Sequence, residues 1–246
     1  MKMKHPSSYD ILGELIILNK KIPKKQAEYL LNLHKQARTV LYKSKEYSGK
    51  YRLPKLTILA GIKNKTTIHK ESNVKININP EKAYFSVRSS NERLRISKLI
   101  KKNETILVMF SGVGIYPLVL SKNSPAKLIY GVEVNPEAHK LAISNVKLNK
   151  TKNVILLKGD VRKIVPNLAK KFDRIIMPHP SDSDSYLKLA RSKLSSNGTI
   201  HLYAFAHEND FNKVKKEYKK QFSKVKIVKA GSPSPGKYRI CLDLQN

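Results

Sequence analysis

Residues 105–114 read TILVMFSGVG, and the architecture expected for the whole chain can be worked out from them. Their first part is an apolar run of strand length, which is typical of a strand buried on both faces. Glycines at positions 112 and 114 then allow the backbone to approach a ligand closely where that strand ends. We expect a strand over 105–110, a tight turn, and a following helix whose N-terminus can hold a negative group.

The same alternation continues toward the C-terminus. Strand–helix alternation predicts a parallel sheet with helices on both faces. The last two apolar runs, 224–229 and 238–244, are joined only by a segment rich in Gly, Ser and Pro, so they should pair antiparallel. Five βα units followed by such a hairpin indicate the α/β, Rossmann-like seven-stranded sheet of methyltransferases. The other predicted strands are 128–133, 154–158, 172–177 and 199–205, and the clearest helices are 136–149, 183–194 and 209–222.

Residues 1–103 show a different pattern, typical of a small α+β domain. We predict a strand over 9–18, a basic helix over 24–41 and a helix over 91–101 that leads into the second half. Short strands are expected at 56–60, 66–70 and 74–78. The chain is therefore predicted to divide into an N-terminal domain, 1–103, and a Rossmann-like domain, 104–246.

Composition narrows the possible partners and chemistries. The 246 residues are 40% hydrophobic, enough for a real core, and their net charge of +31 favours a nucleic-acid partner over a general lysine bias. One cysteine, Cys241, excludes a disulfide framework and a structural zinc site, and it suits a reducing compartment. No two histidines have metal-ligand spacing. The first ten residues lack an apolar signal segment, so we expect a cytoplasmic protein without membrane or metal.

Two acidic residues point to a nucleoside-containing cofactor. Glu133 ends the predicted strand after Gly114, where a carboxylate can accept hydrogen bonds from both ribose hydroxyls. NAD and S-adenosylmethionine (AdoMet) both fit such a site. A third glycine of the dinucleotide pattern is missing, and Asp160 follows the third strand, where it can face an adenine amine, so AdoMet is favoured. The alternatives are a plain turn with a surface glutamate, and an Asp160 that only caps the next helix.

Two further motifs could contact a base or RNA. Pro178-His179-Pro180 follows the fourth strand, and such a rigid turn can seat a flat base, although it is equally a way to end a strand. Three of the nine arginines fall within 88–95, next to Tyr84 and Phe85. Arginine beside aromatic rings suits phosphate recognition and base stacking. The alternative is an ordinary helix start with an i,i+3 pair between Glu92 and Arg95.

With these blocks in place, the chain resembles the archaeal and eukaryotic tRNA (guanine-N1)-methyltransferases that act at position 37, and their wyosine-pathway relatives. The matching blocks run in order over nearly the whole chain. They are SYDILG at 8–13, YRLPK at 51–55, IHKE at 68–71, YFSVR at 84–88 with Glu92-Arg93, MFSGVG at 109–114, VNP at 134–136, GDVR at 159–162, DRIIM at 173–177 and IHLY at 200–203.

The resemblance implies an AdoMet-dependent enzyme that modifies the purine at position 37 of tRNA-Phe. Methylation at N1 of guanine, at C7 of the tricyclic wyosine precursor, or at both is expected. Aminocarboxypropyl transfer from AdoMet and non-catalytic RNA binding are the alternatives. By resemblance, Arg52 is the catalytic arginine, Glu92 the general base, Tyr84 an AdoMet contact, Glu133 the ribose acid and Asp160 the adenine-side acid.

Three departures from the family pattern stand out. Val108 replaces the family's usual aspartate, and Pro178-His179-Pro180 replaces Asn-Leu-Pro, as in the archaeal branch that also methylates C7. Many members carry an extra N-terminal domain, for which we expect no room before Tyr9. We expect a monomer. The predicted site comprises Arg52, Glu92, Pro178, His179 and Pro180 for catalysis; Tyr84, Phe110, Ser111, Gly112, Val113, Gly114, Glu133, Val134, Asp160 and Val161 for the cofactor; and Arg88, Arg93, Arg95 and Arg174 for RNA.

Overall fold

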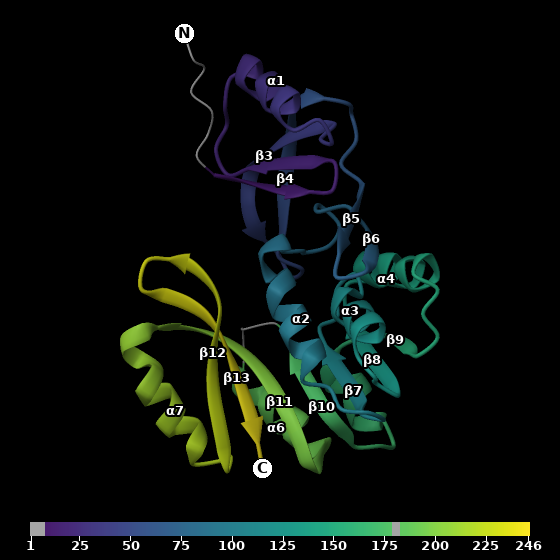
Figure 1. Ribbon diagram of the computed structural model, residues 1–246, viewed down its shortest axis with the longest axis vertical. Coiled ribbons are helices and arrows are strands. Elements are labelled where there is room, and N and C mark those ends of the chain that lie inside the picture. Colours follow the sequence, from purple (N-terminus) through teal and green to yellow (C-terminus); the bar gives the residue numbers. More distant parts are fainter. Residues whose placement is uncertain (1–7, 179–182) are drawn as a thin grey trace.

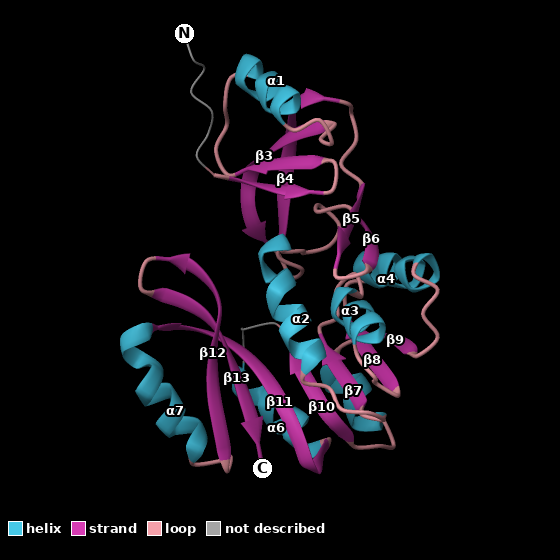
Figure 2. Ribbon diagram, viewed as in Figure 1, coloured by secondary structure: helices cyan, strands magenta, loops and turns pink. Residues whose placement is uncertain are grey.

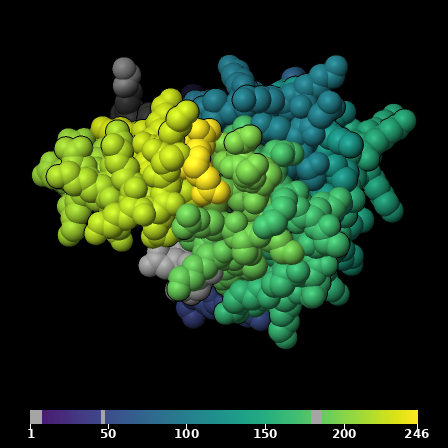
Figure 3. Space-filling view, turned by 90° about the horizontal axis from the view of Figure 1, so that it is seen from below, coloured from purple at the N-terminus to yellow at the C-terminus, as the bar shows by residue number. Residues whose placement is uncertain are grey.

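The computed structural model describes residues 8–178 and 183–246, so the predicted site residues His179 and Pro180 lie outside the described residues. The chain forms an upper part with a small sheet and one helix, and a lower part built on a large sheet (Figures 1 and 2). Seen from below, the C-terminal half covers most of the surface, with the last strands and helix at one side (Figure 3).

The lower sheet confirms the predicted methyltransferase architecture. Its seven strands follow the order β12-β13-β11-β10-β7-β8-β9. The five strands from β7 to β11 are parallel to one another, and β13 pairs antiparallel with both β11 and β12. The strands are β7 (Thr105–Met109), β8 (Leu128–Glu133), β9 (Val154–Lys158), β10 (Phe172–Met177), β11 (Leu194–His207), β12 (Lys224–Ser234) and β13 (Lys237–Gln245).

Helices cover both faces of this sheet because its strands are apolar on both. In β7, Leu107 and Met109 pack toward one cluster, whereas Ile106 and Val108 pack toward the other. The first cluster includes residues of α5 (Val161–Ile164) and α6 (Ser183–Ser192), with α7 (Phe211–Lys219) packed against it. The second includes residues of α2 (Ser90–Lys98) and α3 (Ile115–Asn123).

The N-terminal sheet corrects two predictions. Instead of one strand over 9–18, β1 (Tyr9–Leu12) and β2 (Leu15–Leu18) form a hairpin, because Gly13 turns the chain at φ 54°. The helix predicted over 24–41 ends early: α1 is Lys24–Leu33, and β3 (Thr39–Ser48) follows, parallel to β2. Val40 and Leu41 are fully buried in that strand, and this burial outweighs the helical pattern. The sheet is completed by β4 (Leu53–Gly61).

The hairpin of β5 (Thr67–Glu71) and β6 (Val74–Ile78) connects the two parts of the chain. It packs on α4 (Pro136–Leu148). The side chain of Asn145 accepts a hydrogen bond from the backbone N–H of Asn77 at 2.8 Å and donates one to its carbonyl at 3.1 Å. This hairpin therefore lies against the second predicted domain, and the boundary at residue 103 stays a prediction. Within the described residues, no helix is both long and apolar enough to cross a membrane.

Candidate cofactor and substrate groove

A groove of about 470 Å³ lies at the carboxyl ends of β7, β8 and β9, where parallel sheets bind ligands. It is closed on the other side by the N-terminal part of the chain. The predicted residues that line it are Arg52, Tyr84, Arg93, Phe110, Ser111, Gly112, Val113, Glu133, Val134, Asp160, Val161 and Pro178. Most residues predicted to bind the cofactor are thus brought together.

The turn after β7 has the geometry expected from its glycines. Gly112 and Gly114 have φ of 57° and 82°, in the left-handed region that favours glycine. A side chain at Gly114 would meet the Cβ of Ala142 at 3.2 Å, so this glycine lets the turn pack closely on α4. Phe110 also has a positive φ of 61°, which is uncommon for a bulky residue and typical of functional sites.

Glu133 is fixed by the backbone and faces the groove. One carboxylate oxygen accepts from the N–H of Gly112 and the other from the N–H of Asn135, both at 2.7 Å. Burial raises the pKa of Glu133, and the backbone hydrogen bonds only partly oppose this shift. An ionised carboxylate can accept about four hydrogen bonds, so Glu133 keeps acceptor capacity for a ribose hydroxyl beyond its backbone partners.

Asp160 takes one of the two roles considered for it, that of a helix cap. Its side chain caps α5 by accepting from the N–H of Arg162 at 2.8 Å, and it pairs with the guanidinium of Arg162 at 2.6 Å. This side-chain hydrogen bond holds the pKa of Asp160 below its usual range. The helix-capping alternative is therefore observed, while a contact with an adenine amine stays a prediction.

Aromatic side chains shape the groove walls. Tyr84 is exposed, and the ring of Phe110 packs edge-on against Tyr186 with centroids 4.9 Å apart. The guanidinium of Arg162 lies 5.8 Å from the centre of the Tyr186 ring. Tyr186 was not predicted as a site residue, because it lies in α6, which follows the fourth predicted strand of the large sheet, and no motif surrounds it.

Two arginines line the groove, and one of them contacts Pro178. Arg52 lies in the turn between β3 and β4 and has a positive φ of 51°. Arg239 of β13 places its guanidinium 4.1 Å from the centre of the Tyr203 ring and donates to the carbonyl of Pro178 at 3.2 Å. Arg239 was not predicted either, because the residues next to it in β13 give no sign that it contacts Pro178.

Glu92 lies behind the groove rather than in its wall. It is only 6% exposed and accepts from the hydroxyl of Tyr203 at 2.6 Å and from Arg95 at 2.7 and 2.8 Å. The Tyr203 hydroxyl in turn accepts from that of Tyr116 at 2.9 Å, and Tyr116 lines the groove. Burial raises the pKa of Tyr203 well above its usual value, so both hydroxyls are protonated.

The four arginines predicted to bind RNA differ in their exposure and in their ion-pair partners. Arg93 and Arg174 are 3% and 5% exposed and form internal ion pairs with Glu71 and Glu104, so their burial gives no support to an RNA contact, which stays a prediction. A buried guanidinium needs a carboxylate partner, and both have one. Arg95 is partly buried between Glu92 and Asp243. Arg88 is exposed and pairs with Asp10, so its contact with RNA stays a prediction.

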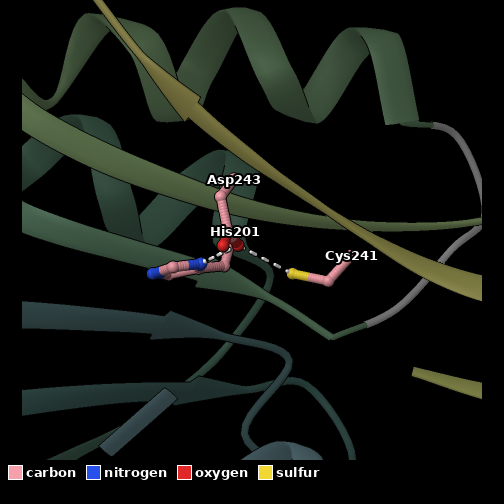
Figure 4. A group of neighbouring side chains, drawn as sticks. All are labelled: His201, Cys241 and Asp243. Atoms are coloured by element: carbon pink, nitrogen blue, oxygen red, sulfur yellow. Dashed lines mark hydrogen bonds and ion pairs between the residues drawn. The ribbon is translucent and has the colours of Figure 1, made fainter. Parts of the chain in front are cut away.

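Figure 4 shows the one His/Cys/Asp cluster of the described residues whose ligand atoms lie close enough for a metal ion. Asp243 accepts from His201 at 2.6 Å and from the Cys241 thiol at 3.2 Å. Arg95 bonds to Asp243 and Arg174 to His201, so the potential ligand atoms of both residues are already occupied by protein groups. Burial raises the pKa of Cys241 well above its usual value, which keeps it a thiol. The cluster therefore suits a structural network rather than a cation.

The fold and groove define the class of this protein: an AdoMet-dependent methyltransferase built on a seven-stranded sheet. The donor set fits AdoMet, because a buried carboxylate for the ribose and close backbone approach at Gly112 adjoin an aromatic wall. Ser111 also lines this groove, and its Oγ is buried without a hydrogen-bond partner among the described residues.

The chain belongs to the TRM5/TYW2 methyltransferase family. The TRM5/TYW2 methyltransferase domain matches residues 67–228, and the TYW2 N-terminal domain matches residues 1–65. The tRNA (guanine(37)-N(1))-methyltransferase Trm5b of Pyrococcus abyssi is 35% identical over 212 residues, which are 83% of this chain and 62% of that protein. The tRNA 4-demethylwyosine(37)-methyltransferase Taw21 of Saccharolobus solfataricus is 30% identical over 250 residues, 96% of this chain and 92% of that protein.

Solved structures agree with this assignment. A complex of aTrm5 with tRNALeu has a TM-score of 0.86 at 31% identity and covers 98% of this chain and 72% of its own. Methanocaldococcus jannaschii TYW2 in complex with AdoMet has a TM-score of 0.74 at 25% identity and covers 97% and 98%. The predicted family, fold class and cofactor are thereby confirmed.

Proposed function

We propose that this chain is a tRNA methyltransferase acting on the purine at position 37, at N1 of guanine, at C7 of the wyosine precursor, or at both. The observation that carries the proposal is the shared groove. Glu133 in its wall fits AdoMet, and Arg52 and Arg239 line the same groove. The chain spans 62% of the length of the Pyrococcus Trm5b and 92% of the length of Taw21.

AdoMet supplies a methyl group that is already activated on a sulfonium, so the protein mainly has to position and deprotonate the base. Glu133, Tyr84 and Phe110 would bind the cofactor, and Asp160 would face its adenine. Arg52 would stabilise the negative charge that develops on O6 as the N1 proton leaves. These roles follow from the residues' places in the groove and from the family resemblance.

The N1 proton needs a route to Glu92, which lies behind the groove wall. The hydroxyls of Tyr116 and Tyr203 supply one: Tyr116 would accept the N1 proton while passing its own to Tyr203, and Tyr203 would pass its proton to Glu92. The N1–H bond breaks and its electron pair would form the bond to the methyl carbon, while the bond from that carbon to the sulfonium sulfur breaks and a neutral thioether leaves; Glu92 would end protonated. In this proposal both tyrosines are neutral before and after the transfer.

The two predicted domains would share the work. Residues 1–103 would position the base through Arg52 and Glu92, and residues 104–246 would bind the cofactor. The net charge of +31 would attract the tRNA backbone. We propose a monomer that works without a metal ion.

The test uses tRNA-Phe transcript with guanine at position 37 and AdoMet labelled separately in the methyl and carboxyl carbons. Methyl label in 1-methylguanosine after digestion is the expected result. Carboxyl label in the RNA would instead show aminocarboxypropyl transfer. If neither label enters the transcript, the assay is repeated on tRNA that carries the wyosine precursor. Absence of methyl label there as well would overturn the proposal.

A further inference from the structure

A second cavity, of about 310 Å³, adjoins the groove. It lies between the N-terminal sheet, the segment 80–88 and Pro233 near the end of β12. In Figure 1 the tip of the β12–β13 hairpin rises toward the N-terminal sheet, where this cavity is found. The resemblance and the proposed chemistry use the groove and leave this cavity without a role.

The cavity shares a wall with the groove. Tyr84, Phe85 and Ser86 line both spaces. Tyr84 is 54% exposed, unusually much for a large aromatic residue. A polynucleotide with one base in the groove must therefore pass its neighbouring nucleotide across or along this wall.

The lining combines an apolar floor with a polar rim. Leu12, Ile17 and Leu56 are buried residues that form part of the floor. At the rim, Arg88 pairs with Asp10 at 2.8 Å, and the ammonium of Lys43 donates to Asn19 at 2.9 Å. A nucleobase needs an apolar surface for its faces, amide and carboxylate groups for its edges, and nearby cations for its phosphate.

We infer that this cavity receives the base of one nucleotide that flanks the target purine, an inference that rests on the proposed function. The volume is at the lower end of the range for small-ligand sites and accommodates one nucleoside. Lys43 and Arg88 attract phosphate, whereas a peptide or lipid would not need the Asp10 and Asn19 edges together with two cations. The base in the cavity holds the strand so that the target stays in the groove.

The test is a binding cycle between protein variants and tRNA with single abasic sites. Asn19→Trp fills the cavity from its rim, and Asn19→Ala removes the amide without filling it. Lys20→Trp, at an exposed neighbour that does not line the cavity, is the matched control. Each variant is titrated with intact tRNA, with tRNA abasic on the 5′ side of the target, and with tRNA abasic on the 3′ side. Thermal unfolding and AdoMet affinity verify that every variant is folded.

Wild type and Lys20→Trp should lose about tenfold in affinity when one of the two flanking bases is missing, as for one stacked base. Asn19→Trp should bind intact tRNA about tenfold more weakly and then be insensitive to the same abasic site. Asn19→Ala should keep its sensitivity. The inference is overturned if wild type is indifferent to both abasic sites, or if Asn19→Trp responds to them as wild type does.

Methyl transfer to intact tRNA distinguishes a failure of the flanking-base inference from a failure of the proposed function. If wild type methylates tRNA, but the effects of Asn19→Trp and of each abasic site on binding simply add, the inference is overturned and the proposed function stands. A wild-type protein that neither binds nor methylates tRNA removes both.

Discussion

Arg239 connects β13 to Pro178 at the end of β10. Its contacts with Pro178 and with the Tyr203 ring fix the groove wall next to the proposed base site. Arg239→Met should lower the rate of methyl transfer by about 10- to 100-fold, because small misplacements of a bound base are costly, while AdoMet affinity stays unchanged. Arg239→Lys should not restore the rate, since an ammonium lacks the planar fork.

The matched control is Arg191→Met. The Arg191 guanidinium also lies over an aromatic ring, that of Phe222, at 5.2 Å, but it does not line the groove. The Arg191→Met variant should transfer methyl groups at the wild-type rate. Equal rates for the Arg239 and Arg191 variants would remove the positioning role of Arg239.

Tyr203→Phe tests the route of the proton to Glu92. The substitution keeps the ring and leaves Glu92 bonded to Arg95, but it interrupts the hydroxyl chain. Single-turnover methylation should slow by about 100-fold, a typical contribution of a positioned proton acceptor. The rate should partly recover at higher pH, where solvent removes the N1 proton more easily. A variant with an unchanged rate and pH profile would contradict the route.

Glu133 makes AdoMet binding sensitive to pH. Burial raises the pKa of this carboxyl, so it takes up a proton at a higher pH than an ordinary glutamate does. A protonated Glu133 loses acceptor capacity for the ribose hydroxyls. AdoMet affinity measured by calorimetry should therefore decrease as the pH falls toward the raised pKa, and Glu133→Gln should be weaker and less pH-dependent. Glu137→Gln, at an exposed pair with Lys82, should behave as wild type.

The ion pair between Glu71 and Arg93 joins β5 to α2. Both side chains are almost fully buried, and the two hydrogen bonds between them are each 2.6 Å long. Glu71→Gln would leave the Arg93 charge buried without compensation, and should reduce the free energy of unfolding by about 3–5 kcal/mol. Denaturant unfolding measures this loss. Glu28→Gln, in an exposed pair with Lys24, should change stability by about 0.5 kcal/mol or less.

The same pair gives stability a defined pH dependence. Burial acts to raise the pKa of Glu71, but hydrogen bonds and charge from His69 and Arg93 outweigh it, so the net pKa is lowered. The contribution is fully present above the pKa of an unfolded glutamate and is lost as the pH falls through the lowered folded value. Wild type should therefore lose stability in acid, and Glu71→Gln should lack this part of the loss.

The charge of the entire chain should dominate its affinity for RNA. With +31 charges, the protein should displace many counterions from tRNA, so the logarithm of the binding constant should fall linearly with the logarithm of salt concentration. If six or more phosphates are neutralised, affinity should fall by about 10³-fold or more between 50 and 200 mM salt. AdoMet affinity in the same buffers is the control and should change little. A flat salt dependence for tRNA would contradict this prediction.

Local sequence was enough to predict the large sheet and most of the cofactor side of the groove. Apolar runs of strand length, the glycines after β7 and the acids after β8 and β9 are all short-range signals, and a parallel sheet brings strand ends to one edge. The Gly-, Ser- and Pro-rich join between the last two strands likewise predicted their antiparallel pairing. These features depend on periodicity and turn chemistry, which a single segment carries.

Contacts between distant segments decided the rest. The early end of α1 depends on pairing between β2 and β3, which no local pattern shows. Glu92 became a buried partner of Tyr203, 111 residues away, and Arg239 reached Pro178 across 61 residues. From their residue type and neighbours, Arg93 and Arg174 are predicted to contact RNA. In the folded chain both side chains are buried, and each pairs with a carboxylate. The sequence alone determines which residues are charged and which motifs are present. How exposed each side chain is, and which groups it contacts, depends on segments that only folding brings together.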